Sequence, residues 1–337
     1  MEFTTTAGNA TTFGNTTAGY EFDPQIEMFK ILVTCILALV MFGMGCAVDH
    51  EKLINNFKRP IGILIGLGCQ ILMMPMIAYG LIKATSMSEL QAITFMVVGC
   101  SPGGTFSNIL AYMVDGDMPL SVALTTLSNL FALGTVPMWL FLYTWIEEVD
   151  ENIQIPYSSL GITLASLIIP IVAGILFRYK FVKIAKYLAK GCAIFGFILL
   201  VAIVAAMLIR NDIPIVFSVK TILPIAVLPI AGMVISFCIS LIPRLELSRE
   251  ARRTIAIETS IQNGSLSTNV VFLTYGNRLN MFMAVITIPL LYSISQTIYN
   301  IILVVIYKTW KFYQKSRNRK FSGQSVTAVG YEVMEMT

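Results

Sequence analysis

Two short segments of this chain place oxygen-bearing side chains beside helix-breaking residues. One runs from Gly99 to Asn108 and contains Pro-Gly-Gly, and the other runs from Ile257 to Ser265 and contains Glu258. Carboxylate, amide and hydroxyl oxygens are the ligands that hard cations prefer, and sodium takes about five or six of them. If the fold brings the two segments together, their side chains can therefore bind an alkali cation.

Further oxygen donors occur close to these segments. The candidate ligands are Gln70, Ser107, Asn108, Ser121, Thr125, Thr126, Glu258, Thr259, Gln262 and Asn263. Ser121 and Thr125 are four residues apart, so they share one face of a helix. Serine and threonine also join membrane helices through ordinary hydrogen bonds, and this is the alternative for each of them.

Glu258 is the sharpest of these signals because it is an acid within an apolar stretch. A charged side chain at the centre of a membrane helix costs roughly 2.5 to 3.5 kcal/mol on insertion scales, which calls for a compensating cation. The alternative is a surface ion pair with Arg253, five residues earlier. Gln262, Asn263 and Gly264 favour the buried position, because they continue the polar character deeper into the span.

The elements that position these residues are predicted to be membrane helices. Of the 337 residues, 56% are hydrophobic and 12% are charged, and the mean hydropathy is +0.77, which excludes an average soluble domain. A span needs roughly 20 apolar residues. The qualifying stretches lie near 28–48, 60–82, 90–113, 119–146, 157–177, 191–210, 221–242, 254–276 and 280–307. The predicted fold class is an all-α polytopic membrane protein with about nine transmembrane helices.

Lys and Arg residues collect in alternate loops, which predicts the orientation in the membrane. With an extracellular N-terminus, eighteen of the 23 basic residues lie on the cytoplasmic side, where such residues are in excess. Asn9 and Asn15 begin glycosylation acceptors in the N-terminal tail and agree with this orientation. An odd number of spans then puts the C-terminus in the cytoplasm. The basic cluster at 308–320 is expected to rest on anionic lipid and does not indicate a nucleic-acid partner.

The cysteines and the single histidine do not predict catalysis. The six cysteines lie inside or at the edge of apolar stretches, and His50 lies in a connecting loop. Neither type has metal-ligand or disulfide spacing, and no nucleophile and base pair occurs in the sequence. An enzyme is therefore not predicted.

The two interrupted spans, 90–113 and 254–276, occupy corresponding places in two groups of three helices. Spans two to four and seven to nine form the matching groups. A separation of five spans inverts one group relative to the other, which is the arrangement of transporters built from inverted repeats. In such proteins the broken helices cross near the middle of the membrane, with half-helix ends and unwound carbonyls at the binding site. The pattern favours a secondary transporter.

Three segments resemble the signature motifs of the bile acid:sodium symporter family. They are Cys-Ser-Pro-Gly-Gly-Thr-Phe-Ser-Asn at 100–108, Asp-Gly-Asp-Met-Pro-Leu-Ser at 115–121 and Arg-Arg-Thr-Ile-Ala-Ile-Glu-Thr-Ser-Ile-Gln-Asn at 252–263. The resemblance implies a core domain moving against a panel domain. Its implied core is about 60–146 and 221–307 and its implied panel about 28–48 and 157–210, within a transmembrane domain at 27–310. Composition and charge predict a disordered extracellular tail at 1–26 and a cytoplasmic tail at 311–337.

The resemblance also implies two sodium sites behind the crossing and a substrate site between core and panel. The implied ligands of one sodium ion are Ser107, Asn108, Ser121, Thr125 and Glu258, and those of the other are Gln70, Glu258 and Gln262. The implied substrate-facing residues are Thr105, Asn263 and Gln296. The chain departs from the pattern of many vertebrate members at Ser260 and at 264–267, while the sodium ligands are retained.

The function that the resemblance implies is sodium-coupled import of bile acids or similar amphipathic organic anions. It would take place in the plasma membrane by alternating access, with sodium as the coupling ion and two sodium ions per substrate. One alternative is a symporter for sulfated steroids or another organic anion. Others are a membrane receptor that binds its ligand without moving it, and a channel.

Overall fold

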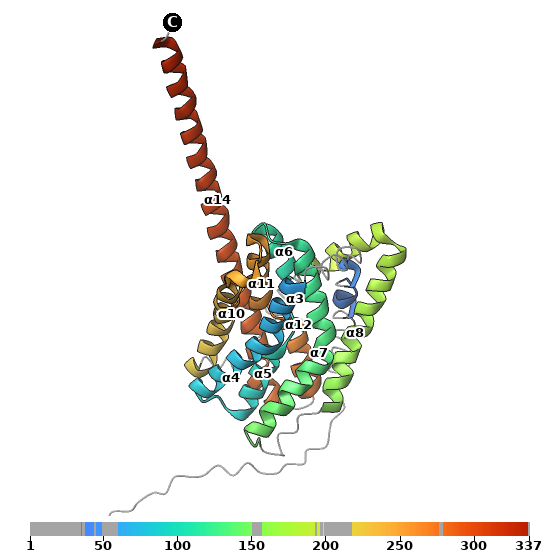
Figure 1. Cartoon of the computed structure of the whole chain (residues 1–337). Coiled ribbons are helices and arrows are strands. Elements are labelled where there is room, and N and C mark those ends of the chain that lie inside the picture. The colour runs from blue at the N-terminus through green and yellow to red at the C-terminus, as the bar shows by residue number, and fades with distance from the viewer. Residues whose placement is uncertain are drawn as a thin grey trace, which may run out of the picture.

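The computed structural model describes Cys35 and residues 38–43, 45–48, 60–104, 106–149, 157–192, 194, 195, 198, 218–275 and 279–335. Regular structure within these ranges is helical (Figure 1). The acceptors Asn9 and Asn15, His50 and Thr105 lie outside the described residues, as does most of the predicted span at 191–210.

The helices follow one another through short connections. They are Ala38–Ala47, α3 (Pro60–Gly68), the π-helix η1 (Cys69–Met73), α4 (Met74–Thr85), α5 (Glu89–Cys100), α6 (Phe106–Met113), α7 (Met118–Ile146), α8 (Tyr157–Lys180), α10 (Val219–Ser240), the 3-10 helix η2 (Pro243–Leu245), α11 (Arg249–Ser260), α12 (Gly264–Tyr275), α13 (Leu279–Val285) and α14 (Thr287–Glu335). The last helix runs far beyond the predicted span at 280–307 and projects from one end of the bundle (Figure 1).

Several helices are long and apolar enough to cross a membrane, as the composition predicts. Within the described part of the chain these are Pro60–Thr85, Val219–Ser240 and Met281–Arg317. Met118–Ala132 and Gly134–Ile146 together form a fourth candidate, bent by 55°. Pro137 explains such a bend, because it has no N–H to donate to the preceding turn. The chain is a helical membrane protein, and the count of nine spans remains a prediction.

A proline also shapes the first long helix. Pro75 cannot donate a hydrogen bond to the preceding turn, and the helix passes through the π-helical turn η1 just before it. The carbonyl of Ile71, four residues before Pro75, instead accepts a hydrogen bond from the indole nitrogen of Trp139 at 2.7 Å. The widened turn carries Gln70, and such turns frequently occur at functional sites.

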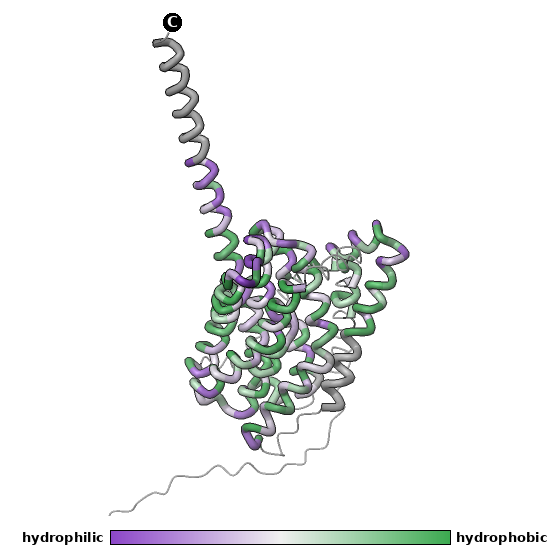
Figure 2. Tube along the Cα trace, in the orientation of Figure 1, coloured by the Kyte–Doolittle hydropathy of each residue, from purple (hydrophilic) through white to green (hydrophobic). Residues whose placement is uncertain are grey.

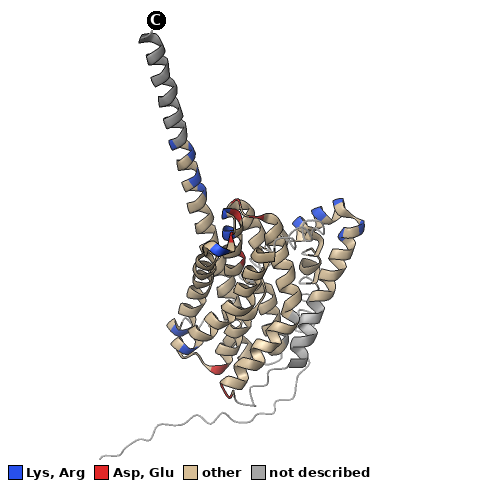
Figure 3. Ribbon diagram, in the orientation of Figure 1, with Lys and Arg blue, Asp and Glu red and all other residues tan. Residues whose placement is uncertain are grey.

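The charged residues gather at the ends of the bundle. Figure 2 shows mostly apolar helices between more polar ends. Lys and Arg are concentrated at the end from which α14 projects, whereas the opposite end carries few of them (Figure 3). This separation is the arrangement that the alternating loops of the sequence predicted.

The helix Ala38–Ala47 packs against α8 at glycine residues. A Cβ atom on Gly45 would overlap the carbonyl of Ile171, and one on Gly174 would overlap the carbonyl of Phe42. Arg178 then donates to the carbonyl of Cys46 at 2.8 Å, near the end of the first helix. Small residues allow membrane helices to approach this closely, so the pair forms a tightly packed unit at one side of the bundle (Figure 1).

We expect Gly174→Ala to destabilise the protein, because the new methyl group meets backbone rather than a flexible side chain. Overpacking of this kind costs about 1 to 3 kcal/mol. Thermal unfolding in detergent measures the effect. Gly80→Ala is the matched control, since its Cβ meets nothing within 4 Å. Equal melting temperatures for the two variants would contradict the close packing.

Candidate ion site at the helix breaks

Both predicted interruptions are present. The first lies between the end of α5 at Cys100 and the start of α6 at Phe106, and the second between the end of α11 at Ser260 and the start of α12 at Gly264. A helix end leaves backbone groups without partners, and a membrane interior offers no water to satisfy them. Each break therefore needs hydrogen-bond partners from the protein.

The two breaks satisfy one another directly. Gly103 and Gln262 form an isolated antiparallel bridge. The N–H of Gly104 donates to Ile261 O at 3.1 Å, and the N–H of Asn263 donates to Pro102 O at 2.7 Å. A Cβ atom on Gly104 would lie 3.0 Å from Gln262 O, so glycine allows this close approach. The expectation that the fold brings the two segments together is confirmed.

Side-chain amides complete the hydrogen bonding of the second break. Gln296 on α14 accepts from the N–H of Gln262 at 2.8 Å and donates to its carbonyl at 3.0 Å. Gln70 donates through Nε2 to the carbonyl of Glu258 at 2.8 Å. Asn263 accepts from the N–H of Leu266 at 3.0 Å and so caps α12. These amides bind backbone that the missing helical turn leaves unpaired.

Asn129 on α7 joins the two breaks. Its Nδ2 donates to Gly103 O at 3.0 Å and to Thr125 O at 2.7 Å, while its Oδ1 accepts from Asn263 Nδ2 at 3.3 Å. The preceding residue on the same helix, Ser128, accepts from the N–H of Gly103 at 3.2 Å. One side chain thus contacts both breaks and the helix beside them.

Glu258 lies directly behind this crossing and is fully buried. The hydroxyl groups of Ser121 and Thr125 donate to its two carboxylate oxygens, the second at 2.8 Å. Arg253 does not pair with it and donates instead to Asp115 O at 2.6 Å. The alternative of a surface ion pair between Glu258 and Arg253 is therefore wrong.

The other predicted ligands of the first sodium ion surround the same carboxylate. Asn108 donates from Nδ2 to Thr125 Oγ1 at 3.3 Å, and its Oδ1 lies 2.8 Å from Ser121 Oγ. Ser107 is buried and donates to Gly104 O at 2.6 Å. The structure thus brings together the five residues of this set, which come from α6, α7 and α11.

In the second predicted set, Gln70 contacts the backbone of Glu258 through its hydrogen bond to the carbonyl. Gln70 is buried, and among the described residues its Oε1 has no hydrogen-bond partner. The amide of Gln262 faces the carbonyls of Ser101 and Pro102 and, with its nitrogen turned towards them, donates to both. Gln70 therefore offers an unused acceptor oxygen, as a cation ligand would.

The substrate-facing assignments remain predictions. Asn263 and Gln296 are buried, and their amides bind the backbone of the breaks. Thr105, the third residue of this set, is outside the described ranges. A cavity of about 420 Å³ lies nearby and is lined by Asn108, Thr125 and Thr126 together with residues of the helix Ala38–Ala47 and Lys190.

The sequence analysis missed several residues that support the breaks. Two buried polar pairs join elements far apart in the chain: Ser101 with Ser267 at 2.7 Å and Ser260 with Asn300 at 3.0 Å. Asn129 was also missed, although it lies eight residues after Ser121 and hence on the same helical face. That polar stripe within an apolar helix was the signal that could have found it.

These features define a class of protein: a helical membrane protein with a buried carboxylate behind two paired helix breaks. The model of the Sodium Bile acid symporter family matches residues 34–218. The chain belongs to this family, which is one of transporters and not of enzymes.

Relatives from mammals are similar over most of their length. The human "Sodium-dependent organic anion transporter" is 36% identical over 310 residues, which cover 90% of this chain and 79% of the relative. The mouse "Ileal sodium/bile acid cotransporter" is 38% identical over 285 residues, covering 84% and 80%. Its human counterpart is 39% identical with the same coverage.

We expect Asn129→Leu to lower stability, because it leaves the buried carbonyl of Gly103 without its amide partner. A buried polar group without a partner costs about 1 to 3 kcal/mol. Thr126→Val is the matched control, since within the described ranges the Thr126 hydroxyl bonds only to Val122 O of its own helix. Thermal unfolding in detergent compares the two, and an unchanged midpoint for Asn129→Leu would argue against its role.

Proposed function

We propose that the chain is a sodium-coupled symporter that imports bile acids or similar amphipathic organic anions. The observation that carries the proposal is the fully buried Glu258, surrounded by oxygen-bearing side chains. Membership of the Sodium Bile acid symporter family and the sodium-dependent relatives support it.

The burial of Glu258 is a reason to expect a bound cation. Two hydroxyl donors stabilise a carboxylate only in part, and an unpaired charge removed from water is costly. No described Lys or Arg forms an ion pair with this carboxylate. A sodium ion would supply the missing positive charge, and hydroxyl, amide and carboxylate oxygens are suitable ligands.

The proposed stoichiometry is two sodium ions that share Glu258. The first would be held by Ser107, Asn108, Ser121 and Thr125, and the second by Gln70 and Gln262. Two observations support this assignment of ligands: the side chains of the first set lie close together, and Oε1 of Gln70 has no partner among the described residues. Because one carboxylate would bind both ions, their binding is expected to be coupled.

Transport would follow from movement of a core, about 60–146 and 221–307, against a panel, about 28–48 and 157–210. The inverted repeats of the core would place the two breaks at its centre, where access alternates between the membrane faces. The concentration of basic residues at the end of the bundle near α14 supports an intracellular C-terminus and an extracellular N-terminus.

The cavity of about 420 Å³ is the proposed cytoplasmic end of the substrate path. Its apolar walls suit a steroid skeleton, and Lys190 at its edge suits an anionic group. A tenfold sodium gradient contributes about 1.4 kcal/mol per ion, and one net charge moved through 100 mV contributes about 2.3 kcal/mol. Two ions and a monovalent anion thus provide roughly 5 kcal/mol, enough for an accumulation of several thousandfold.

The printed names of the relatives favour two substrate classes. One group is named for bile acid and the other for organic anions in general. A bile acid such as taurocholate is the first choice here, and a sulfated steroid is the second. Parallel uptake of both compounds in sodium and choline media decides between them. Counterflow in proteoliposomes tests for transport, because a receptor would bind ligand without exchanging it.

We expect Glu258→Gln to reduce sodium-dependent taurocholate uptake at least about tenfold, a loss of about 1.4 kcal/mol or more. The amide keeps the shape of the side chain but removes the charge that would bind sodium. Glu250→Gln is the matched control, because Glu250 is an exposed carboxylate on the same helix. Sodium-stimulated uptake that persists in Glu258→Gln would contradict the proposed ion site.

Val122→Trp should block uptake, because Val122 lines the cavity and a larger side chain would fill it. Val122→Ala leaves the cavity open and serves as the control at the same position. Sodium-dependent uptake, corrected for the amount of protein at the cell surface, measures both. Uptake by Val122→Trp equal to that of the parent would place the substrate path elsewhere.

A further inference from the structure

A second cavity lies away from the ion site, between α10, α11 and α14. Its volume is about 490 Å³, within the roughly 300 to 1,000 Å³ range of ligand sites. Its walls include Val234 and Phe237 on α10, Ile257 on α11 and Ile306 on α14. Val234 and Ile306 are 50% and 64% exposed, so the cavity is open at the lipid-facing side of the bundle.

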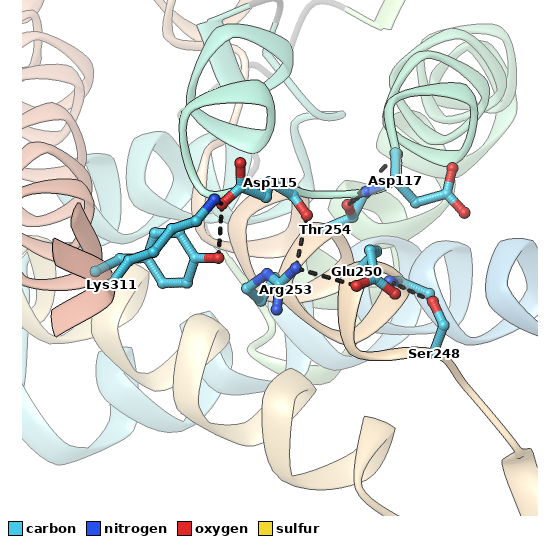
Figure 4. Close-up of polar contacts among 9 residues, drawn as sticks. Asp115, Asp117, Ser248, Glu250, Arg253, Thr254 and Lys311 are labelled. Carbon is cyan, nitrogen blue, oxygen red and sulfur yellow. Dashed lines mark hydrogen bonds and ion pairs between the residues drawn. The ribbon is translucent and has the colours of Figure 1, made fainter. Parts of the chain in front are cut away.

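Arg253 is the one charged residue that lines this cavity within the described part of the chain. Its Nη2 donates to the carbonyl of Asp115 at 2.6 Å and lies 3.5 Å from the carboxylate of Glu250 (Figure 4). The guanidinium lies over the ring of Tyr307, at 5.3 Å. Its Nε has no hydrogen-bond partner among the described residues, so the donor capacity of Arg253 is only partly used.

The side chain of Asp115, whose carbonyl binds Arg253, is already paired. The carboxylate of Asp115 accepts from Lys311 at 2.6 Å and from Tyr307 at 2.8 Å. These hydrogen bonds, first that of Lys311, hold the pKa of Asp115 below its ordinary value, so Asp115 is ionised at neutral pH. Among the residues that the structure describes, only the exposed Glu250, at 3.5 Å, forms an ion pair with Arg253. The guanidinium therefore remains available to a further anion.

Aromatic side chains lie where the cavity meets the charged end of the bundle. Tyr307 and Trp310 both line it, and Trp310 is 55% exposed. Tyrosine and tryptophan prefer the level of the lipid head groups. The cavity thus combines an apolar wall for a hydrocarbon chain with an aromatic and cationic rim at the depth of a phosphate.

We propose that this cavity binds an acidic phospholipid of the surrounding leaflet, with the phosphate at Arg253 and an acyl chain along α10 and α14. The end of the bundle rich in Lys and Arg attracts such lipids (Figure 3). In the proposed orientation this basic end of the bundle lies at the cytoplasmic leaflet, which carries the anionic lipids. The site is separate from the proposed sodium and substrate sites, so it does not depend on transport.

Quenching of Trp310 by brominated lipid tests the proposal, because Trp310 lines the cavity. The purified chain is reconstituted in phosphatidylcholine vesicles that contain a small fraction of brominated phosphatidylserine or brominated phosphatidylcholine. The signal of Trp310 is obtained by subtracting that of Trp310→Phe. We expect brominated phosphatidylserine to quench the Trp310 fluorescence at a concentration about fivefold lower than brominated phosphatidylcholine does. A single basic residue near an anionic lipid surface contributes about 1 kcal/mol, which corresponds to this ratio.

Two variants separate a specific site from general attraction to basic residues. Arg253→Gln removes the proposed phosphate contact, and Val234→Phe fills the cavity without changing any charge. Both should abolish the preference for phosphatidylserine. The matched controls are Arg252→Gln, the neighbouring cation, and Ile230→Phe, which lies one turn earlier on α10 and does not line the cavity. Both controls should keep the preference.

Three results would overturn the proposal. The first is equal quenching by the two lipids in the parent chain. The second is a preference that survives in Val234→Phe, since this variant keeps every charge and is not expected to disturb the fold. The third is displacement of the brominated lipid by taurocholate, which would make the occupant a transported anion and not a phospholipid.

Discussion

Backbone groups that lose their helical partners have to be satisfied inside an apolar bundle. In this protein the backbone of the break after α5 binds the backbone of the break after α11, through the bridge between Gly103 and Gln262. Neither break would be stable alone in a lipid environment, because an unpaired peptide group costs several kcal/mol there. The position of each broken helix therefore depends on the other, although they are separated by about half the chain.

This mutual dependence also determines where Glu258 lies. Glu258 lies in the last turn of α11, just before the break. Ser121 and Thr125, one turn apart on α7, bind its carboxylate through their hydroxyl groups. Asn129, on the same face of α7, holds the crossing in register by binding groups from both breaks. Any movement that changes the crossing must therefore change the surroundings of the carboxylate, which is a physical basis for coupling an ion to a conformational change.

The connection between α6 and α7 links this centre to one end of the bundle. Asp115 receives hydrogen bonds from α11 and α14 (Figure 4). The hydroxyl of Thr254 accepts from the N–H of Asp117 and donates to its carbonyl. The charged end is thus a structured connector and not simply a solvated loop. It joins the helix that carries Glu258 to the long last helix, and the apolar cavity with Arg253 lies beside it.

Hydropathy and helix-breaking residues were sufficient to predict a helical membrane protein, the two interruptions and the buried acid beside the second one. These features are local, because lipid imposes its requirements on each span separately. The pairing of Asn129 with both breaks, the two hydrogen bonds of Gln296 to Gln262 and the contact of Trp139 with Ile71 depended on tertiary structure. An amide or indole can bind many partners, and only the packing of distant helices decides which unpaired backbone group it reaches.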